Sequence, residues 1–192
     1  AGLAWLTTQQ RGDGGFAPIG SLDLTNWTTA PAAIALMAGN QTSAADAAVQ
    51  WLKSVSAYTF TPSSSSPYGY DTTLAAWPWF ENDYSWVEPT SLAMIALRKA
   101  GLANDPKVQQ GRTLMLDRQC QTGGWNYGEP QVLGSNLPPA AAPTGLAVLA
   151  LHNLDVDLAG AIAFLQSQRD TQTSLFSMAW AGIALAATGL LD

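Results

Sequence analysis

The sequence predicts an all-α fold of four helical hairpins, and three observations support this prediction. A pair consisting of an aromatic residue or methionine followed by leucine occurs four times on helical patterns: Trp5-Leu6, Trp51-Leu52, Met115-Leu116 and Phe164-Leu165. An alanine-rich stretch follows each pair and ends in Ala-Leu, as in Thr29 to Leu36, Thr90 to Leu97, Thr144 to Leu151 and Met178 to Leu185. Strict alternation of apolar and polar residues, which is typical of strands, is missing at useful length. Each unit is therefore expected to be helix, loop, helix and turn.

The expected hairpins cover residues 1–40, 43–101, 105–153 and 156–190 of one 1–192 domain. Their helices are predicted near residues 1–10, 25–38, 44–57, 87–100, 106–120, 140–153, 156–169 and 173–188. Asp105 before Pro106 and Ser85 three residues before Glu88 have the pattern of helix starts. Left-handed caps are expected where the second helices end, at Gly39, Gly101, Asn153 and Gly189.

Composition limits the partners of this chain. Its formal net charge is −6 and its eight Lys and Arg are scattered, so nucleic acid is not expected as a partner. No apolar run has the length to cross a bilayer, so no membrane span is expected. Because the chain begins at Ala1 without Met, we interpret it as an excised or processed part of a longer chain, and an exported or cell-surface location is favoured.

Two segments share a glutamine, a Gly-Gly turn and an aromatic residue: Gln9, Gly14, Gly15 and Phe16, then Gln119, Gly123, Gly124 and Trp125. Glycine permits the tight turn, and an amide can satisfy backbone groups that a helix end leaves open. Buried amides that hydrogen-bond to backbone are therefore predicted for Gln9 and Gln119.

These segments resemble the Gln-Trp motif of the squalene-cyclase and prenyltransferase superfamily. The resemblance implies an α/α toroid, or an open arc, of inner and outer helices in which the glutamine and the aromatic residue tie neighbouring repeats together. It covers nearly the whole chain as a periodic pattern, but its sharp motifs cover only the two turns.

The chemistry that the resemblance would imply lacks its residues here. Class II terpene cyclases protonate their substrate from an Asp-x-Asp-Asp motif, and the nearest string runs from Asp155 to Leu158, where Asp is a natural helix cap. Asp117, Cys120 and His152 do not have the spacing of the zinc ligands in prenyltransferases. No metal, no cofactor and no cyclase activity of the chain alone are therefore expected.

Two long loops are expected, the first from Tyr58 to Ser85 and the second from Gly123 to Pro139. Aromatic residues are frequent in and beside them, and seven are predicted to bind a ligand: Trp77, Trp79, Phe80, Tyr84, Trp86, Trp125 and Tyr127. All except Phe80 are further predicted to converge at one mouth of the helical ring, where π faces would line an apolar site. Among them, Glu81, Asp83 and Glu88 are weak candidates for an acid whose pKa is raised by desolvation. In the alternative interpretation the rings only seal the helix ends and Glu88 caps a helix with Ser85. Trp27 and Trp180 are predicted to be core residues.

Three functions remain open from the sequence. The first is a squalene-cyclase-like repeat domain that binds an isoprenoid or another apolar ligand without a cyclase acid. The second is a structural or protein-interaction domain, whose terminal hairpins leave apolar faces for a partner or for self-association. The third is a carbohydrate-active α/α barrel in which Glu81 and Glu129 act together, although the Gly-Gly-aromatic turns argue against it.

Overall fold

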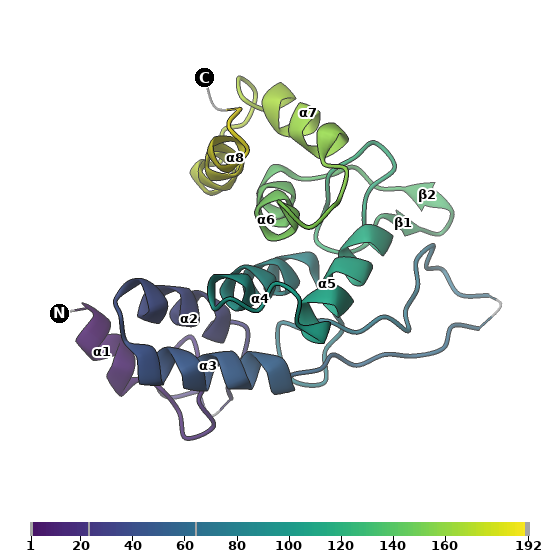
Figure 1. Cartoon of the computed structure of the whole chain (residues 1–192). Coiled ribbons are helices and arrows are strands. Elements are labelled where there is room, and N and C mark those ends of the chain that lie inside the picture. Colours follow the sequence, from purple (N-terminus) through teal and green to yellow (C-terminus); the bar gives the residue numbers. More distant parts are fainter. Residues whose placement is uncertain (1, 23, 64, 191–192) are drawn as a thin grey trace. The chain divides into compact units, whose positions relative to one another are not determined.

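The computed structural model describes residues 2–22, 24–63 and 65–190. Within these residues it has eight α-helices and one small antiparallel hairpin (Figure 1). The helices are α1 (Gly2–Thr8), α2 (Thr29–Ala38), α3 (Thr42–Ser54), α4 (Val87–Lys99), α5 (Pro106–Asp117), α6 (Ala141–Leu151), α7 (Ala159–Ser167) and α8 (Leu175–Ala187). Strands β1 (Gln131–Val132) and β2 (Ser135–Asn136) pair in the register Gln131↔Asn136 and Val132↔Ser135. The all-α prediction is confirmed, and the helices lie in the eight predicted regions, most of them a few residues shorter.

The described chain divides into two compact units. Unit 1 consists of residues 1–59 and 75–111, and unit 2 of residues 60–74 and 112–192. The grouping of the chain into one domain of four hairpins, and the toroidal arrangement, stay predictions.

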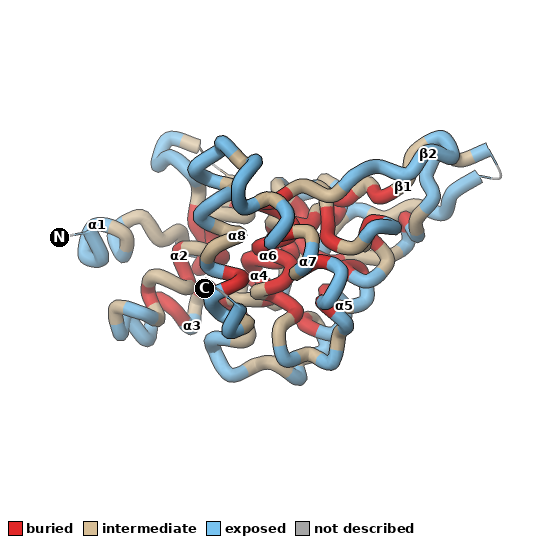
Figure 2. The backbone as a smooth tube through the Cα atoms, turned by 90° about the horizontal axis from the view of Figure 1, so that it is seen from above, coloured by how far each residue is buried: buried red, intermediate tan, exposed pale blue. Residues whose placement is uncertain are grey.

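One helix in each unit is buried almost all round. In unit 1, α4 packs on α2 and α3, and the side chains of Met94 and Leu97 are fully buried. In unit 2, α6 packs on α7 and α8 and is mostly buried (Figure 2). Leu146 and Leu151 are among its buried residues. A Cβ on Gly145 of α6 would lie 2.7 Å from the backbone carbon of Trp180 in α8. Small residues therefore let these second helices approach closely.

The ends of the second helices follow the prediction with one shift. Gly101, Asn153 and Gly189 have the expected positive φ, at 81°, 63° and 75°. After α2 the left-handed residue is Asn40, with φ 56°, whereas Gly39 has φ −93° and its N–H still donates to the carbonyl of Ala35 at 3.0 Å. The helical hydrogen bonding thus continues one residue further than predicted.

The predicted helix starts had different outcomes. Pro106 is the first residue of α5, and the Asp105 carboxylate accepts the N–H of Lys107 at 2.9 Å, so this prediction is confirmed. The capping box of Ser85 and Glu88 is wrong, because the Ser85 hydroxyl accepts the N–H of Ala76 at 2.7 Å instead. Ser85 therefore fastens the preceding loop rather than α4.

No helix in the described part of the chain combines the length and apolar character that crossing a membrane requires.

Candidate functional site

The two Gly-Gly turns have the same backbone hydrogen bonds. In the first, the N–H of Arg11 donates to the carbonyl of Gly15 at 3.0 Å, and in the second the N–H of Cys120 donates to that of Gly124 at 3.0 Å. Arg11 thus corresponds to Cys120. A Cβ on Gly14 would lie 2.6 Å from a backbone oxygen of α3, and one on Gly123 would lie 2.8 Å from a backbone carbon of α7. Both positions have positive φ, so the turns need glycine for space and for conformation.

This correspondence pairs Gln119 with Gln10 and not with Gln9. The Gln10 amide donates to the carbonyls of Gly14 and Ala44, both at 2.8 Å, as predicted for its neighbour. Gln9 instead donates to the Thr8 hydroxyl at 3.1 Å in an exposed position, so the prediction for Gln9 is wrong.

The prediction for Gln119 is also wrong. Its side chain is only half-buried, and in the described chain it makes no hydrogen bond. The second carbonyl that Gln10 reaches, that of Ala44, belongs to the first turn of α3. In the first turn, Gly14 contacts α3 at Ala47, three residues after Ala44. In the second turn, Gly123 contacts α7 at Gly160. The residue equivalent to Ala44 is therefore Asp157, which precedes α7.

A second hydrogen-bond pattern joins one aromatic residue in each of three loops to a threonine in the first turn of the next helix, and we call it the aromatic–threonine clamp. The threonine hydroxyl accepts a hydrogen bond from the backbone N–H of the aromatic residue at 2.9, 3.3 and 2.9 Å, and each threonine is fully buried. The three pairs are Phe16–Thr29, Trp77–Thr90 and Trp125–Thr144. The clamps fix where each loop meets its second helix.

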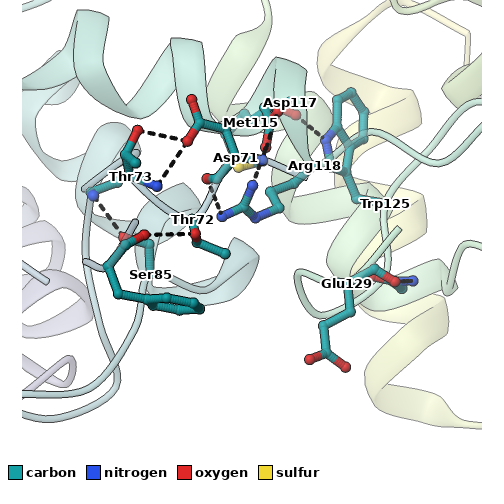
Figure 3. Close-up of polar contacts among 12 residues, drawn as sticks. Asp71, Thr72, Thr73, Ser85, Met115, Asp117, Arg118, Trp125 and Glu129 are labelled. Carbon is teal, nitrogen blue, oxygen red and sulfur yellow. Dashed lines mark hydrogen bonds and ion pairs between the residues drawn. The ribbon is translucent and has the colours of Figure 1, made fainter. Parts of the chain in front are cut away.

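Trp77 and Trp125 belong to the cores of their own units. They are 2% and 0% exposed, and their indole N–H groups donate to the carbonyls of Leu52 at 2.8 Å and Met115 at 2.7 Å; the Trp125 bond is drawn in Figure 3. The structure therefore gives these two predicted ligand-binding residues a packing role.

The other aromatics of the first long loop lie nearer the surface. Trp79 is half-buried and packs edge-to-face on Trp27 at 5.0 Å between ring centroids. Phe80 and Tyr84 are 44% and 46% exposed, and the Trp86 indole donates to the Asp83 carboxylate at 2.9 Å. In unit 2, Tyr127 is 54% exposed. Convergence of aromatics from both loops at one mouth stays a prediction.

A cavity of about 460 Å³ lies within unit 1, and we call it the aromatic cavity. Residues from three segments line it, namely 11, 13 and 24–27, then 51 and 54–56, and finally 78–81. Its aromatic lining residues are Trp27, Trp51, Trp79 and Phe80. This volume falls among those of small-molecule sites, roughly 300–1,000 Å³. Of the predicted ligand-binding residues, Trp79 and Phe80 line this cavity. Trp51 also lines it, as does Trp27, for which the prediction of a core position is wrong.

Three charged side chains line the aromatic cavity: Arg11, Asp13 and Glu81. Partial burial raises the pKa of Asp13, but the nearby Thr25 hydroxyl, the Gly15 N–H at 3.0 Å and the Arg11 charge outweigh it, so the pKa is lowered. Glu81 is exposed. Asp13 thus lacks the raised pKa expected of a catalytic acid, and the Glu81 carboxylate is open to solvent.

The two other acid candidates, Asp83 and Glu88, are not among the residues that line the aromatic cavity. The Asp83 carboxylate accepts the N–H of Tyr84 at 2.7 Å and the Trp86 indole, so it fastens the loop. Glu88 lies in the first turn of α4, and burial raises its pKa.

In unit 2 a polar cluster around the buried Arg118, which the sequence did not suggest, attaches the other part of the first long loop to the end of α5 (Figure 3). The Asp117 carboxylate accepts the N–H of Asp71 at 3.2 Å and pairs with Arg118, which donates to the carbonyl of Asp71 at 3.1 Å. The Arg118 guanidinium lies 4.0 Å from the centre of the Tyr70 ring. Burial, and then the Glu129 charge, raises the pKa of Tyr70 to about 12. Each of these contacts joins two residues of the chain, so we assign the cluster a structural role.

Among the described residues, no three His, Cys, Asp or Glu side chains gather closely enough to hold a metal ion. No family model and no curated protein matches the sequence.

Proposed function

We propose that the chain is a repeat domain of the squalene-cyclase and prenyltransferase type whose aromatic cavity binds an isoprenoid or another apolar small molecule, without a catalytic acid of its own. The observation that carries this proposal is a cavity of about 460 Å³ with three tryptophans and a phenylalanine in its lining. Large aromatic rings bury about 150–250 Å² each, so even partial contact with four of them supplies substantial apolar area to a ligand.

The walls of this cavity are fastened before any ligand arrives. The N–H of Trp27 donates to the carbonyl of Trp79 at 3.3 Å, which joins two of the three lining segments. The clamps at Phe16 and Trp77 hold the same segments to α2 and α4. Preorganised walls lower the entropic cost of binding, which favours affinity.

The acid groups favour binding over protonation chemistry. A carboxyl group that protonates an alkene needs a raised pKa in a desolvated site. At the aromatic cavity the pKa of Asp13 is lowered and Glu81 is exposed, so neither has that environment.

Recurrence along the chain supports the repeat part of the proposal. Clamps of one geometry begin the second helix of three predicted hairpins. A shared bond also occurs in the turn after the second helix of the first, second and fourth predicted hairpins. It runs from a backbone N–H to the carbonyl of the buried leucine five residues earlier: Gln41 to Leu36, Leu102 to Leu97 and Leu190 to Leu185. Such recurrence is expected of a repeat array.

Tryptophan fluorescence tests the binding proposal. Titration of the whole chain with isoprenoids of increasing length is expected to give saturable quenching with Kd in the micromolar range or below. Trp79→Ala and Trp51→Ala should each weaken binding about tenfold or more, whereas Tyr127→Ala, at an exposed ring of unit 2, should leave it unchanged. An unchanged spectrum at saturating ligand would refute the proposal.

One observation favours a second function, protein interaction through α8. This helix has no charged residue, and four of its large apolar side chains are exposed: Leu175, Phe176, Met178 and Ile183. Contiguous exposed apolar residues of this kind mark interaction surfaces. If α8 mediates self-association, sedimentation will show a concentration-dependent oligomer that Phe176→Lys abolishes; a monomer at all concentrations would exclude self-association.

A further inference from the structure

The first helix of a predicted hairpin packs against the second helix of the hairpin before it. Helix α3 packs on α2 in unit 1, and α7 packs on α6 in unit 2. Helix α5 meets α4 at Gly111, where an added Cβ would lie 2.8 Å from the Sδ atom of Met94. In the described part of the chain, no hairpin precedes α1 and none follows α8. Each of these two helices therefore lacks one neighbour of this kind there.

The face of α1 that would meet such a neighbour is open. By the correspondence of the two Gly-Gly turns, Gly2 is the equivalent of Gly111 and Trp5 that of Leu114. Leu114 is fully buried, whereas Trp5 is 63% exposed. A Cβ on Gly2 would have nothing within 4 Å, in contrast to one on Gly111.

The matching face of α8 is open as well. The shared Ala-Leu ends of the second helices align Gly182 of α8 with Met94 of α4. Met94 is fully buried, but a Cβ on Gly182 would have nothing within 4 Å. The contact between Met94 and Gly111 thus corresponds to Gly182 on α8 and Gly2 on α1, and both of these positions are uncovered.

A groove of about 270 Å³ lies beside Gly182 in unit 2. Met178 and Leu185 of α8 and Leu165 of α7 are among the apolar residues that line it. This volume is below the roughly 300–1,000 Å³ of small-molecule sites and suits one large side chain of a protein partner. Neither α1 nor α8 has a charged residue, so a contact between them would desolvate no charge on either helix.

We propose that α1 of a second copy of the chain packs on α8, as the first helix of one hairpin packs on the second helix of the hairpin before it. Gly2 of the second copy then lies against Gly182. Helices joined by a turn as short as residues 39–41, between α2 and α3, run antiparallel. In the same arrangement Trp5, one turn after Gly2, lies against Met178, one turn before Gly182. This inference rests on the second candidate function, self-association through α8, and names the surface of the partner.

The variants Trp5→Lys and Met178→Lys each remove one half of this contact and leave the other half intact. In sedimentation velocity at increasing concentration, the native chain is expected to associate reversibly. Each variant should associate at least about tenfold more weakly, because a charge would be buried in an apolar contact. Ile19→Lys and Leu133→Lys place the same charge at other residues that are 61% and 80% exposed, and they should leave association unchanged.

Mixing the two variants distinguishes this contact from a symmetric one. The intact α8 of Trp5→Lys and the intact α1 of Met178→Lys can still meet, and the two altered surfaces repel each other. An equimolar mixture is therefore expected to form one-to-one dimers that neither variant forms alone. Circular dichroism checks the folding of both, and Trp5→Ala and Met178→Ala take their place if either lysine variant does not fold.

The remaining outcomes separate this inference from the function on which it rests. In a symmetric contact between two α8 helices, Trp5→Lys would associate like the native chain; that result would overturn the inference and leave self-association through α8 in place. A mixture without dimers would also overturn the inference. A native chain that stays monomeric would overturn self-association and the inference with it, while binding at the aromatic cavity is decided separately by the isoprenoid titration.

Discussion

Trp77 and Trp79 are two positions apart in one loop, yet they have different roles. Trp77 is 2% exposed, its backbone is clamped to Thr90, and its indole donates to the carbonyl of Leu52. Trp79 is half-buried, packs edge-to-face on Trp27 and lines the aromatic cavity. The comparison teaches that aromatic content marks this loop as important but does not say what each ring does. Polar partners make that distinction, because an indole with a buried acceptor is fixed in the core.

The largest difference between the two tryptophans is expected when each is replaced by alanine. Trp77→Ala is expected to lower the free energy of unfolding by about 3–5 kcal/mol, because a large cavity and an unpaired Leu52 carbonyl remain. Trp79→Ala is expected to cost roughly 1 kcal/mol, since its ring is partly solvated already. Urea denaturation measures both, and equal losses would contradict the assignment of one ring to the core and one to the cavity.

Glycines of unit 2 extend the comparison between buried and open positions. Gly145→Ala is expected to destabilise by about 1–3 kcal/mol, because the new Cβ would lie 2.7 Å from the Trp180 backbone. In α8 a Cβ on Gly182 would have nothing within 4 Å, so Gly182→Ala should stabilise by up to about 1 kcal/mol through helix propensity. Thermal unfolding gives both values, and a loss of stability in Gly182→Ala would show that the open face of α8 is covered.

Removing the clamp hydroxyl tests whether the clamp, rather than the ring alone, keeps Trp77 in the core. Thr90→Val keeps the shape but leaves the N–H of Trp77 unpaired, so a loss of about 1–3 kcal/mol is expected. Thr188→Val is the matched control, because its hydroxyl donates only within its own helix, and it should cost less than about 0.5 kcal/mol. Similar losses in the two variants would show that the clamps add little stability.

The smallest expected effect concerns Glu88 in the first turn of α4. Burial raises its pKa above the ordinary value of 4.5, so the folded protein binds this proton more tightly than the unfolded chain. The resulting stability is fully present below that value and is lost as pH rises through the folded-state pKa. Glu88→Gln should therefore gain stability relative to the native chain between about pH 4 and pH 7. The side chain is partly solvated, so the gain should stay below about 1 kcal/mol, and a constant difference across this range would contradict the shift.

The helices were predictable from the sequence because their signals are local. Apolar period, Pro106 and the glycines after the second helices act within a few residues, and the stretches from Thr29, Thr90 and Thr144 already displayed the recurring threonine. Which side chain makes a given hydrogen bond depends on the path of the backbone, which residue spacing does not specify. Gln9 and Gln10 are adjacent, and only the path of the turn decides which amide reaches Ala44.

Contacts between distant segments were not predictable in the same way. The Asp71 N–H reaches the Asp117 carboxylate only because the first long loop returns to α5, and no local sequence pattern predicts this contact. Likewise, Ser85 has the sequence spacing of a helix cap, but in the folded chain its hydroxyl accepts the N–H of Ala76 from the loop. The cavity itself combines three separate segments of unit 1, so its lining could be assembled only from the fold.

The most direct test of the account is a titration of the ¹⁵N-labelled chain with methyl farnesoate, followed through the indole N–H resonances of its tryptophans. If the aromatic cavity is the ligand site, the resonances of Trp27, Trp51 and Trp79 will shift together and saturate. Those of Trp77 and Trp125 should stay in place and exchange slowly with deuterium, because both indoles are buried and hydrogen-bonded. Shifts centred on Trp77 or Trp125, with no change at Trp79, would contradict it.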